Sequence, residues 1–127
     1  MGVGVAVYPR IENTSADWVL DINGKALSRG MERLFKLIKR QGYKDLMDYF
    51  VPSQDDLDEW QVDQKAEIAW YNPAEGLALI EAMTRAFHAH RDQFENPEQL
   101  EEDLDCFRKI LDRAASEGLR WNLGITY

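Results

Sequence analysis

Four basic side chains recur at helical spacing and are suited to binding anionic groups. Their spacings of 4, 3 and 4 residues place them in one stripe along a helix. We call this stripe the basic ridge; it consists of Arg29, Arg33, Lys36 and Arg40. Such a line of cations can bind phosphate groups, an acidic partner helix or the acidic part of the molecule itself. A solvated helix face that binds nothing has the same spacing and stays an alternative.

A second group of side chains is acidic and surrounds one tryptophan. We call it the acidic segment; it consists of Asp55, Asp56, Asp58, Glu59, Trp60 and Asp63. A calcium-binding EF-hand loop needs Gly at its sixth position, and counting from Asp56 that position is Gln61. An aromatic side chain among carboxylates suits contact with an arginine-rich protein. The segment is therefore a candidate partner-binding site, with a solvated acidic surface as the alternative.

The histidines and the cysteine give no catalytic pattern. His88 and His90 are two residues apart, so on a helix they point to nearly opposite sides, which argues against a shared zinc site. His90 falls on the apolar face, either as a residue at the edge of the core or as a functional group. Cys106 lies between the apolar positions Leu104 and Phe107, which favours inert packing. The sequence predicts no metal and no cofactor.

The charges are sorted along the chain. Residues 1–52 carry eight Lys/Arg and six Asp/Glu, a balance of +2, and residues 53–127 carry seven and seventeen, a balance of −10. The total of −8 argues against nucleic acid as a partner, because phosphates would be repelled by most of the surface. It is compatible with a basic partner protein, or with a homo-oligomer in which the ridge meets the acidic surface of a neighbour.

Length and composition predict a single domain over residues 1–127. The chain is 45% hydrophobic and 30% charged, as in globular proteins. No apolar run approaches the ~20 residues needed to cross a bilayer, and the first residues lack the basic start of a signal peptide. One cysteine excludes an internal disulfide. We therefore expect a cytoplasmic protein without membrane contact.

Helical patterns surround the candidate sites. An apolar stripe of Leu27, Met31, Leu34 and Ile38 predicts a helix over about 25–41, opposite the basic ridge. A short helix is expected over 44–50. The Asn-Pro pairs at 72–73 and 96–97 each predict a helix start, with Asn as the cap and a Glu or Gln reaching back.

The last of these helices should end at Gly118. Its first turns hold Glu101, Glu102, Asp103 and Asp105, which we assign to favourable interaction with the helix dipole.

Alternating residues predict four strands, over 3–8, 17–22, 66–71 and 120–127. Pro9 should limit the first strand. The fold class that follows is α+β, with a small mixed sheet of three to four strands covered by two to four helices. Both ends of the chain are expected to lie in the sheet.

Three runs of the sequence resemble a group of small bacterial proteins of unknown function. They are 21–27 (DINGKAL), 70–77 (WYNPAEGL) and 118–123 (GLRWNL). The resemblance implies a single bacterial domain and adds no activity and no site.

The leading functional hypothesis is a non-enzymatic protein-interaction domain, in its concrete form an immunity or antitoxin-like protein that binds a basic toxin. A self-assembling structural domain is one alternative. The other is an enzyme or small-ligand binder with a pocket near Trp70, Tyr71, His90 and Trp121.

Overall fold

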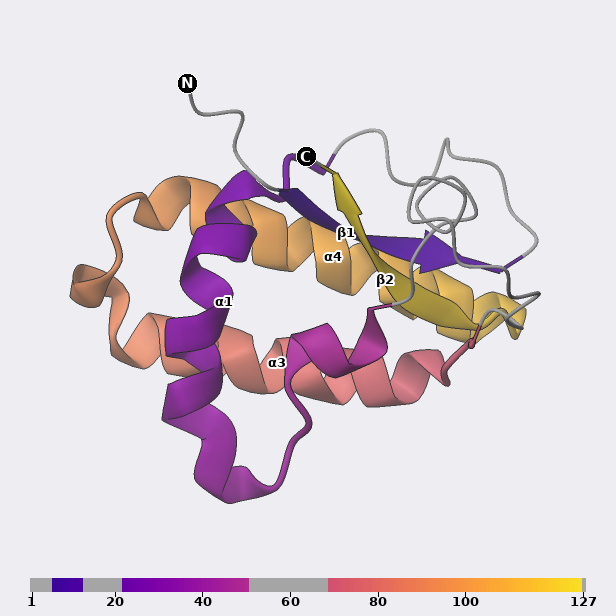
Figure 1. Ribbon diagram of the computed structural model, residues 1–127. Helices are drawn as coiled ribbons and strands as arrows, with labels where there is room; N and C mark the ends of the chain where they lie inside the picture. Colours follow the sequence, from indigo (N-terminus) through magenta and orange to yellow (C-terminus); the bar gives the residue numbers. More distant parts are fainter. Residues whose placement is uncertain (1–5, 13–21, 51–68, 127) are drawn as a thin grey trace, which may run out of the picture.

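The computed structural model describes residues 6–12, 22–50 and 69–126. In this part of the chain, three α-helices and a two-stranded sheet form an α+β fold around a hydrophobic core (Figure 1). In chain order the elements are β1 (Ala6–Ile11), α1 (Lys25–Ile38), the 3₁₀ turns η2 (Lys39–Gln41) and η3 (Leu46–Tyr49), α3 (Pro73–Ala89), the 3₁₀ turn η4 (Arg91–Gln93), α4 (Pro97–Glu117) and β2 (Trp121–Thr126).

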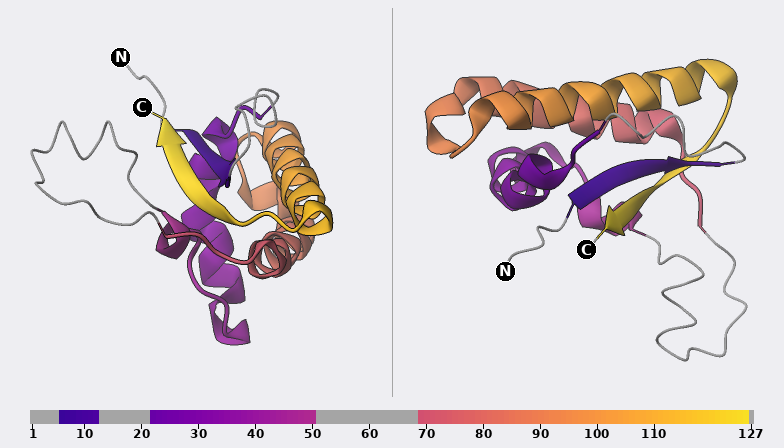
Figure 2. Two further views of the ribbon diagram at one scale, coloured as in Figure 1. Left: turned by 90° about the vertical axis from the view of Figure 1, so that its right-hand side faces the viewer. Right: turned by 90° about the horizontal axis from the view of Figure 1, so that it is seen from above.

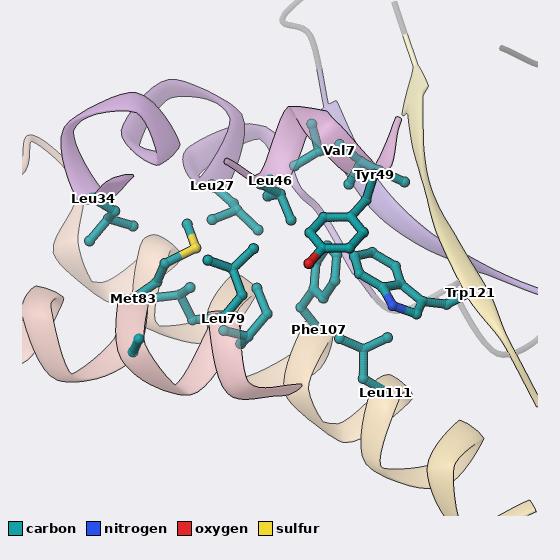
Figure 3. Packing of buried hydrophobic residues seen from close by; sticks show 14 of the residues in the cluster. Val7, Leu27, Leu34, Leu46, Tyr49, Leu79, Met83, Phe107, Leu111 and Trp121 are labelled. Carbon is teal, nitrogen blue, oxygen red and sulfur yellow. The ribbon is translucent and has the colours of Figure 1, made fainter. Parts of the chain in front are cut away.

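The elements form two layers, with the core between them. Helices α3 and α4 lie side by side in one layer, and α1, η3 and the sheet lie in the other (Figure 2). Side chains from both layers point toward one another, among them Leu27 of α1, Met83 of α3 and Phe107 of α4 (Figure 3). The apolar stripe predicted for α1 is buried at Leu27, Leu34 and Ile38. The basic ridge on its opposite side is therefore directed outward.

The sheet is smaller than the three to four strands predicted from the sequence. Among the described residues it consists of β1 and β2, antiparallel, with Val7 opposite Ile125. Of the strand predicted over 66–71, the described residues 69–71 contribute a single bridge, in which Tyr71 and Trp121 exchange both backbone hydrogen bonds. After Tyr71 the pairing ends, because Pro73 begins α3 two residues later. Residues 66–68 lie outside the described part. Residues 13–21, which include most of the predicted second strand, lie outside the described part.

The prediction that Pro9 limits the first strand is wrong, because β1 continues to Ile11. The N–H of Glu12 donates to Arg120 O on the β2 side, whereas the N–H of Val7 donates to Gly24 O on the other side. Pro9 is an even number of residues from Val7 and therefore turns its nitrogen away from β2. Its missing N–H removes no hydrogen bond of the ladder.

Helix α1 begins at a glycine that contacts β1 closely. Gly24 has φ of 75°, and a Cβ at this position would lie 2.1 Å from Val7 O. A side chain is therefore excluded by both the backbone conformation and the neighbouring strand. Because Gly24 offers no side-chain cap, Asp103 of α4 supplies one: its Oδ2 accepts a hydrogen bond from Leu27 N at 3.1 Å.

The two Asn-Pro helix starts differ in the structure. Asn72 caps α3, since its Oδ1 accepts from Ala74 N at 2.9 Å. The predicted cap by Asn96 is wrong, because its side chain makes no capping bond to α4. Gln99 does not reach back either; its Nε2 donates to Asp103 Oδ1 at 3.0 Å.

Trp121 of β2 lies at the centre of the aromatic part of the core. Its ring stacks on Tyr49, with centroids 4.9 Å apart, and contacts Phe107 edge-on. Gly76 of α3 makes room for the indole, because a Cβ there would lie 2.6 Å from Trp121 Cζ2. The indole N–H donates to Asn72 O. These contacts join η3, α3, α4 and β2 in one cluster.

Candidate functional site

The basic ridge lies on the exposed side of α1 and its continuation into η2. Arg29, Arg33 and Lys36 belong to α1, whereas Arg40 lies in η2, and all four are exposed. Lys36 pairs with Glu32 at 3.7 Å, but both side chains are largely in solvent, so the pair contributes little. Within the described part of the chain, Arg29 and Arg40 have no ion-pair partner. The structure thus brings the four predicted cations to one surface.

A hollow of about 310 Å³ lies beside the first half of this ridge. It is formed where α1 faces the connection between α3 and α4. Its lining consists of Ala26, Arg29, Gly30, Arg33, Gln93, Phe94, Glu95, Asn96 and Leu100. We call this cavity the arginine hollow. Sequence reasoning found its two arginines but not its other wall, which comes from residues about 60 positions further along the chain.

The acidic segment lies outside the described residues. Its members, Asp55, Asp56, Asp58, Glu59, Trp60 and Asp63, fall within 51–68. Their assignment to a partner-binding surface stays a prediction.

A different acidic surface lies on α3 and α4. A hollow of about 300 Å³ is lined by Thr84, His88, Glu98, Glu101, Glu102, Asp105 and Arg108, which together we call the acidic face. Four carboxylates against one guanidinium give the lining a formal charge of −3, with His88 neutral. On α4 these residues stand on the side away from the buried positions Leu104, Phe107 and Leu111. The acidic face is therefore open to a partner.

The carboxylates of the acidic face differ in whether they already form an ion pair with a cation of this chain. Asp105 pairs with Arg108 at 2.9 Å and Lys109 at 3.0 Å, and hydrogen bonds from these two cations lower the pKa of its carboxyl. Glu101 pairs with Arg91. Glu98 and Glu102 are exposed, and neither has an ion pair to any described residue. As far as the described residues go, these two carboxylates are open to a cation of a partner.

Sequence reasoning assigned most of these acids to the dipole of their own helix. The spacing test that revealed the basic ridge would also have placed Glu98, Glu101 and Asp105 on one stripe. Sequence reasoning groups Asp103 with these acids, but Asp103 does not line the acidic face. It is 1% exposed, and it caps α1 rather than facing solvent.

The pocket predicted near Trp70, Tyr71, His90 and Trp121 is not assembled in one place. Tyr71 precedes α3 and His90 follows it, and α3 is 17 residues long. At 1.5 Å per residue its ends are about 25 Å apart. His90 is half-buried, with Nδ1 3.2 Å from Gln93 Nε2, while His88 is exposed on the acidic face. Trp121 is fully buried among other core side chains.

Cys106 is half-buried on α4. Burial, followed by the charges of Glu102 and Asp105, raises the pKa of its thiol. A thiol with a raised pKa carries little thiolate at neutral pH, so the site does not favour nucleophilic chemistry.

Within residues 6–12, 22–50 and 69–126, no three His, Cys, Asp or Glu side chains are grouped so that they could hold a metal ion. None of the helices described is long and apolar enough to cross a bilayer.

Comparison with known proteins gives no match: no protein-family model fits the chain, and no curated protein or solved structure is significantly similar to it. The function therefore has to be argued from the chain's own surfaces.

Proposed function

We propose that this chain is a non-enzymatic protein-interaction domain that binds a basic partner protein. The observation that carries the proposal is the acidic face, a concave surface on two packed helices. Two of its carboxylates, Glu98 and Glu102, have no ion pair within the described part of the chain. Cations of a partner would gain hydrogen bonds to charged acceptors there, and such bonds are stronger than those between neutral groups. The charge of −10 over residues 53–127 would also accelerate encounter with a basic protein.

The concrete form of this function is inhibition of a cationic toxin, as by an immunity protein or antitoxin. Interfaces of that kind rely on complementary charge for fast and specific association. The acidic segment around Trp60 extends the proposal, since an aromatic anchor among carboxylates suits an arginine-rich surface.

The proposal is tested by crosslinking in the organism that encodes the chain. Tagged wild-type protein should capture a basic protein at low and moderate salt. A Glu98→Gln/Glu102→Gln double variant should capture at least about fivefold less, because two charge-assisted contacts are lost. Glu75→Gln serves as the matched control: this exposed carboxylate of α3 is not part of the acidic face, so capture should change by less than about twofold.

The outcomes separate the remaining candidates. Equal capture by the wild type and the double variant would rule out the acidic face as the binding surface, and no captured basic protein would refute the function. Capture of a differently tagged copy of this chain would instead establish self-assembly through opposite charges.

A further inference from the structure

The arginine hollow combines a charged rim with an apolar floor. Arg29 and Arg33 stand one turn apart on α1, so both guanidinium groups can approach one ligand. Leu100 is 2% exposed, and the Phe94 ring packs on Phe87 with centroids 5.5 Å apart. These contacts hold the floor in a fixed position. Sites for small molecules have this composition, namely apolar walls with a few convergent polar groups.

The two guanidinium groups are available for a ligand. Arg33 Nη1 donates to the backbone carbonyl of Gln93 at 2.8 Å, which orients the group across the hollow. A guanidinium has five N–H donors, so others remain. Arg29 has no ion-pair partner within the described ranges. Glu95 also lines the hollow, but none of the ion pairs found among the described residues joins it to either arginine.

Gly30 keeps the base of the hollow open. It is buried in the middle of α1, where glycine weakens a helix relative to alanine. A Cβ there would lie 3.2 Å from Leu100 Cδ2 and 3.5 Å from Phe94 Cδ1. Any side chain at this position would therefore press against the apolar floor.

The start of α4 adds positive potential at the same place. Asn96 is the residue before the first turn and lines the hollow, yet its side chain makes no capping bond. The partial positive charge at this end of the helix favours an anion nearby.

We propose that the arginine hollow is a binding site for a small organic anion. Its phosphate or carboxylate group pairs with Arg29 and Arg33, and its apolar part lies over Phe94 and Leu100. The volume of about 310 Å³ accommodates a ligand of roughly the size of a single substituted ring. This site is separate from the acidic face and does not depend on the function proposed for it.

The proposal is tested by NMR titration of the full chain with phenyl phosphate, benzoate and inorganic phosphate. We expect saturable amide shifts at Gly30, Phe94 and Asn96. At least one of the ring-bearing anions should bind more tightly than inorganic phosphate, because its ring covers the apolar floor. The comparison of phenyl phosphate with benzoate decides which acid group the hollow prefers.

Matched variants distinguish binding in the arginine hollow from general electrostatic attraction of anions to the basic ridge. Arg29→Gln should weaken binding about tenfold or more, since a charge-assisted hydrogen bond is lost. Arg40→Gln removes the same charge from the same ridge but outside the hollow, and should change affinity less than about twofold. Arg33→Lys keeps the charge and loses the planar fork, so binding should also weaken.

Absence of saturable shifts up to roughly 10 mM of all three anions would overturn the proposal. Equal weakening by Arg29→Gln and Arg40→Gln would also overturn it, since binding would then follow net charge alone. Because Arg29 is exposed, the Arg29→Gln variant should keep the fold. The NMR spectrum of each variant would report directly whether that variant is folded.

Discussion

At the scale of single residues, Asp103 shows how a charged side chain becomes part of the core. Both of its carboxylate oxygens accept hydrogen bonds, one from Leu27 N of α1 and one from Gln99 on its own helix. The N-cap of α1 is Gly24, which has no side chain and cannot satisfy the free amides of the first turn. The Asp103 carboxylate of α4 accepts from one of these amides instead, and its negative charge interacts favourably with the positive end of the α1 dipole.

This role predicts a specific loss of stability. Asp103→Ala leaves the Leu27 N–H buried without a partner, which should lower the free energy of unfolding by about 1–3 kcal/mol. Urea denaturation followed by circular dichroism measures the change. Asp112→Ala, an exposed site on the same helix, is the control and should stay within about 0.5 kcal/mol of the wild type. Equal midpoints for the two variants would contradict the capping role.

At the scale of elements, the two Asn-Pro helix starts show that the same residues can act differently. The φ of Asn72 is −68° and that of Asn96 is −130°, and only Asn72 makes a capping bond. The turn before α4 follows η4 directly, and Asn96 there lines the arginine hollow. Proline at the first helical position marks both starts correctly, because its fixed φ and missing N–H suit that position in any context.

This difference in capping predicts that an Asn→Ala substitution has unequal effects on stability at the two helix starts. Asn72→Ala removes the bond to Ala74 N and should cost about 1 kcal/mol of stability. Asn96→Ala removes no capping bond and should cost clearly less, within about 0.5 kcal/mol of the wild type. Thermal or urea unfolding of the two variants side by side makes the comparison. A larger loss for Asn96→Ala would show that it caps α4 in solution.

At the scale of the whole molecule, the two described strands come from opposite ends of the chain, and an ion pair joins them beside their backbone ladder. Arg120 Nε, next to β2, donates to Glu12 Oε1 at 3.0 Å, and Nη2 donates to Oε2, so the pair is bidentate. These hydrogen bonds from Arg120 hold the pKa of Glu12 below its usual value.

The lowered pKa gives the pair a defined pH dependence. Its contribution to stability is present above the pKa of about 4.3 of an unfolded glutamate and is lost as the pH falls through the lower folded value. A double-mutant cycle with Glu12→Gln and Arg120→Gln should therefore give a coupling at pH 6 that declines toward pH 3. A coupling that does not vary with pH would mean that the ion pair is absent in solution.

The separation of charge along the sequence becomes a separation in space. Helix α1 carries four basic residues and one acidic residue, a balance of +3, while α4 carries three basic and seven acidic residues, a balance of −4. The basic ridge could be predicted because a helix with a buried stripe directs its opposite side to solvent. The acidic face on α3 and α4, in contrast, consists of other residues than the acidic segment that the sequence predicts as a binding site.

The sequence by itself determined the local properties of this protein. Short stretches of sequence contain the apolar period of α1, the prolines that begin α3 and α4, and the strand character near both chain ends. That the two strands pair with one another was decided by the tertiary structure. Only the tertiary structure decided which acid is buried, which asparagine caps its helix, and that residues 69–71, the described part of the third predicted strand, form one bridge. It also brought Phe94 and Leu100 together with Arg29 and Arg33 around one hollow. These features depend on contacts between residues that are distant in the chain, and helical or strand periodicity carries no information about such contacts.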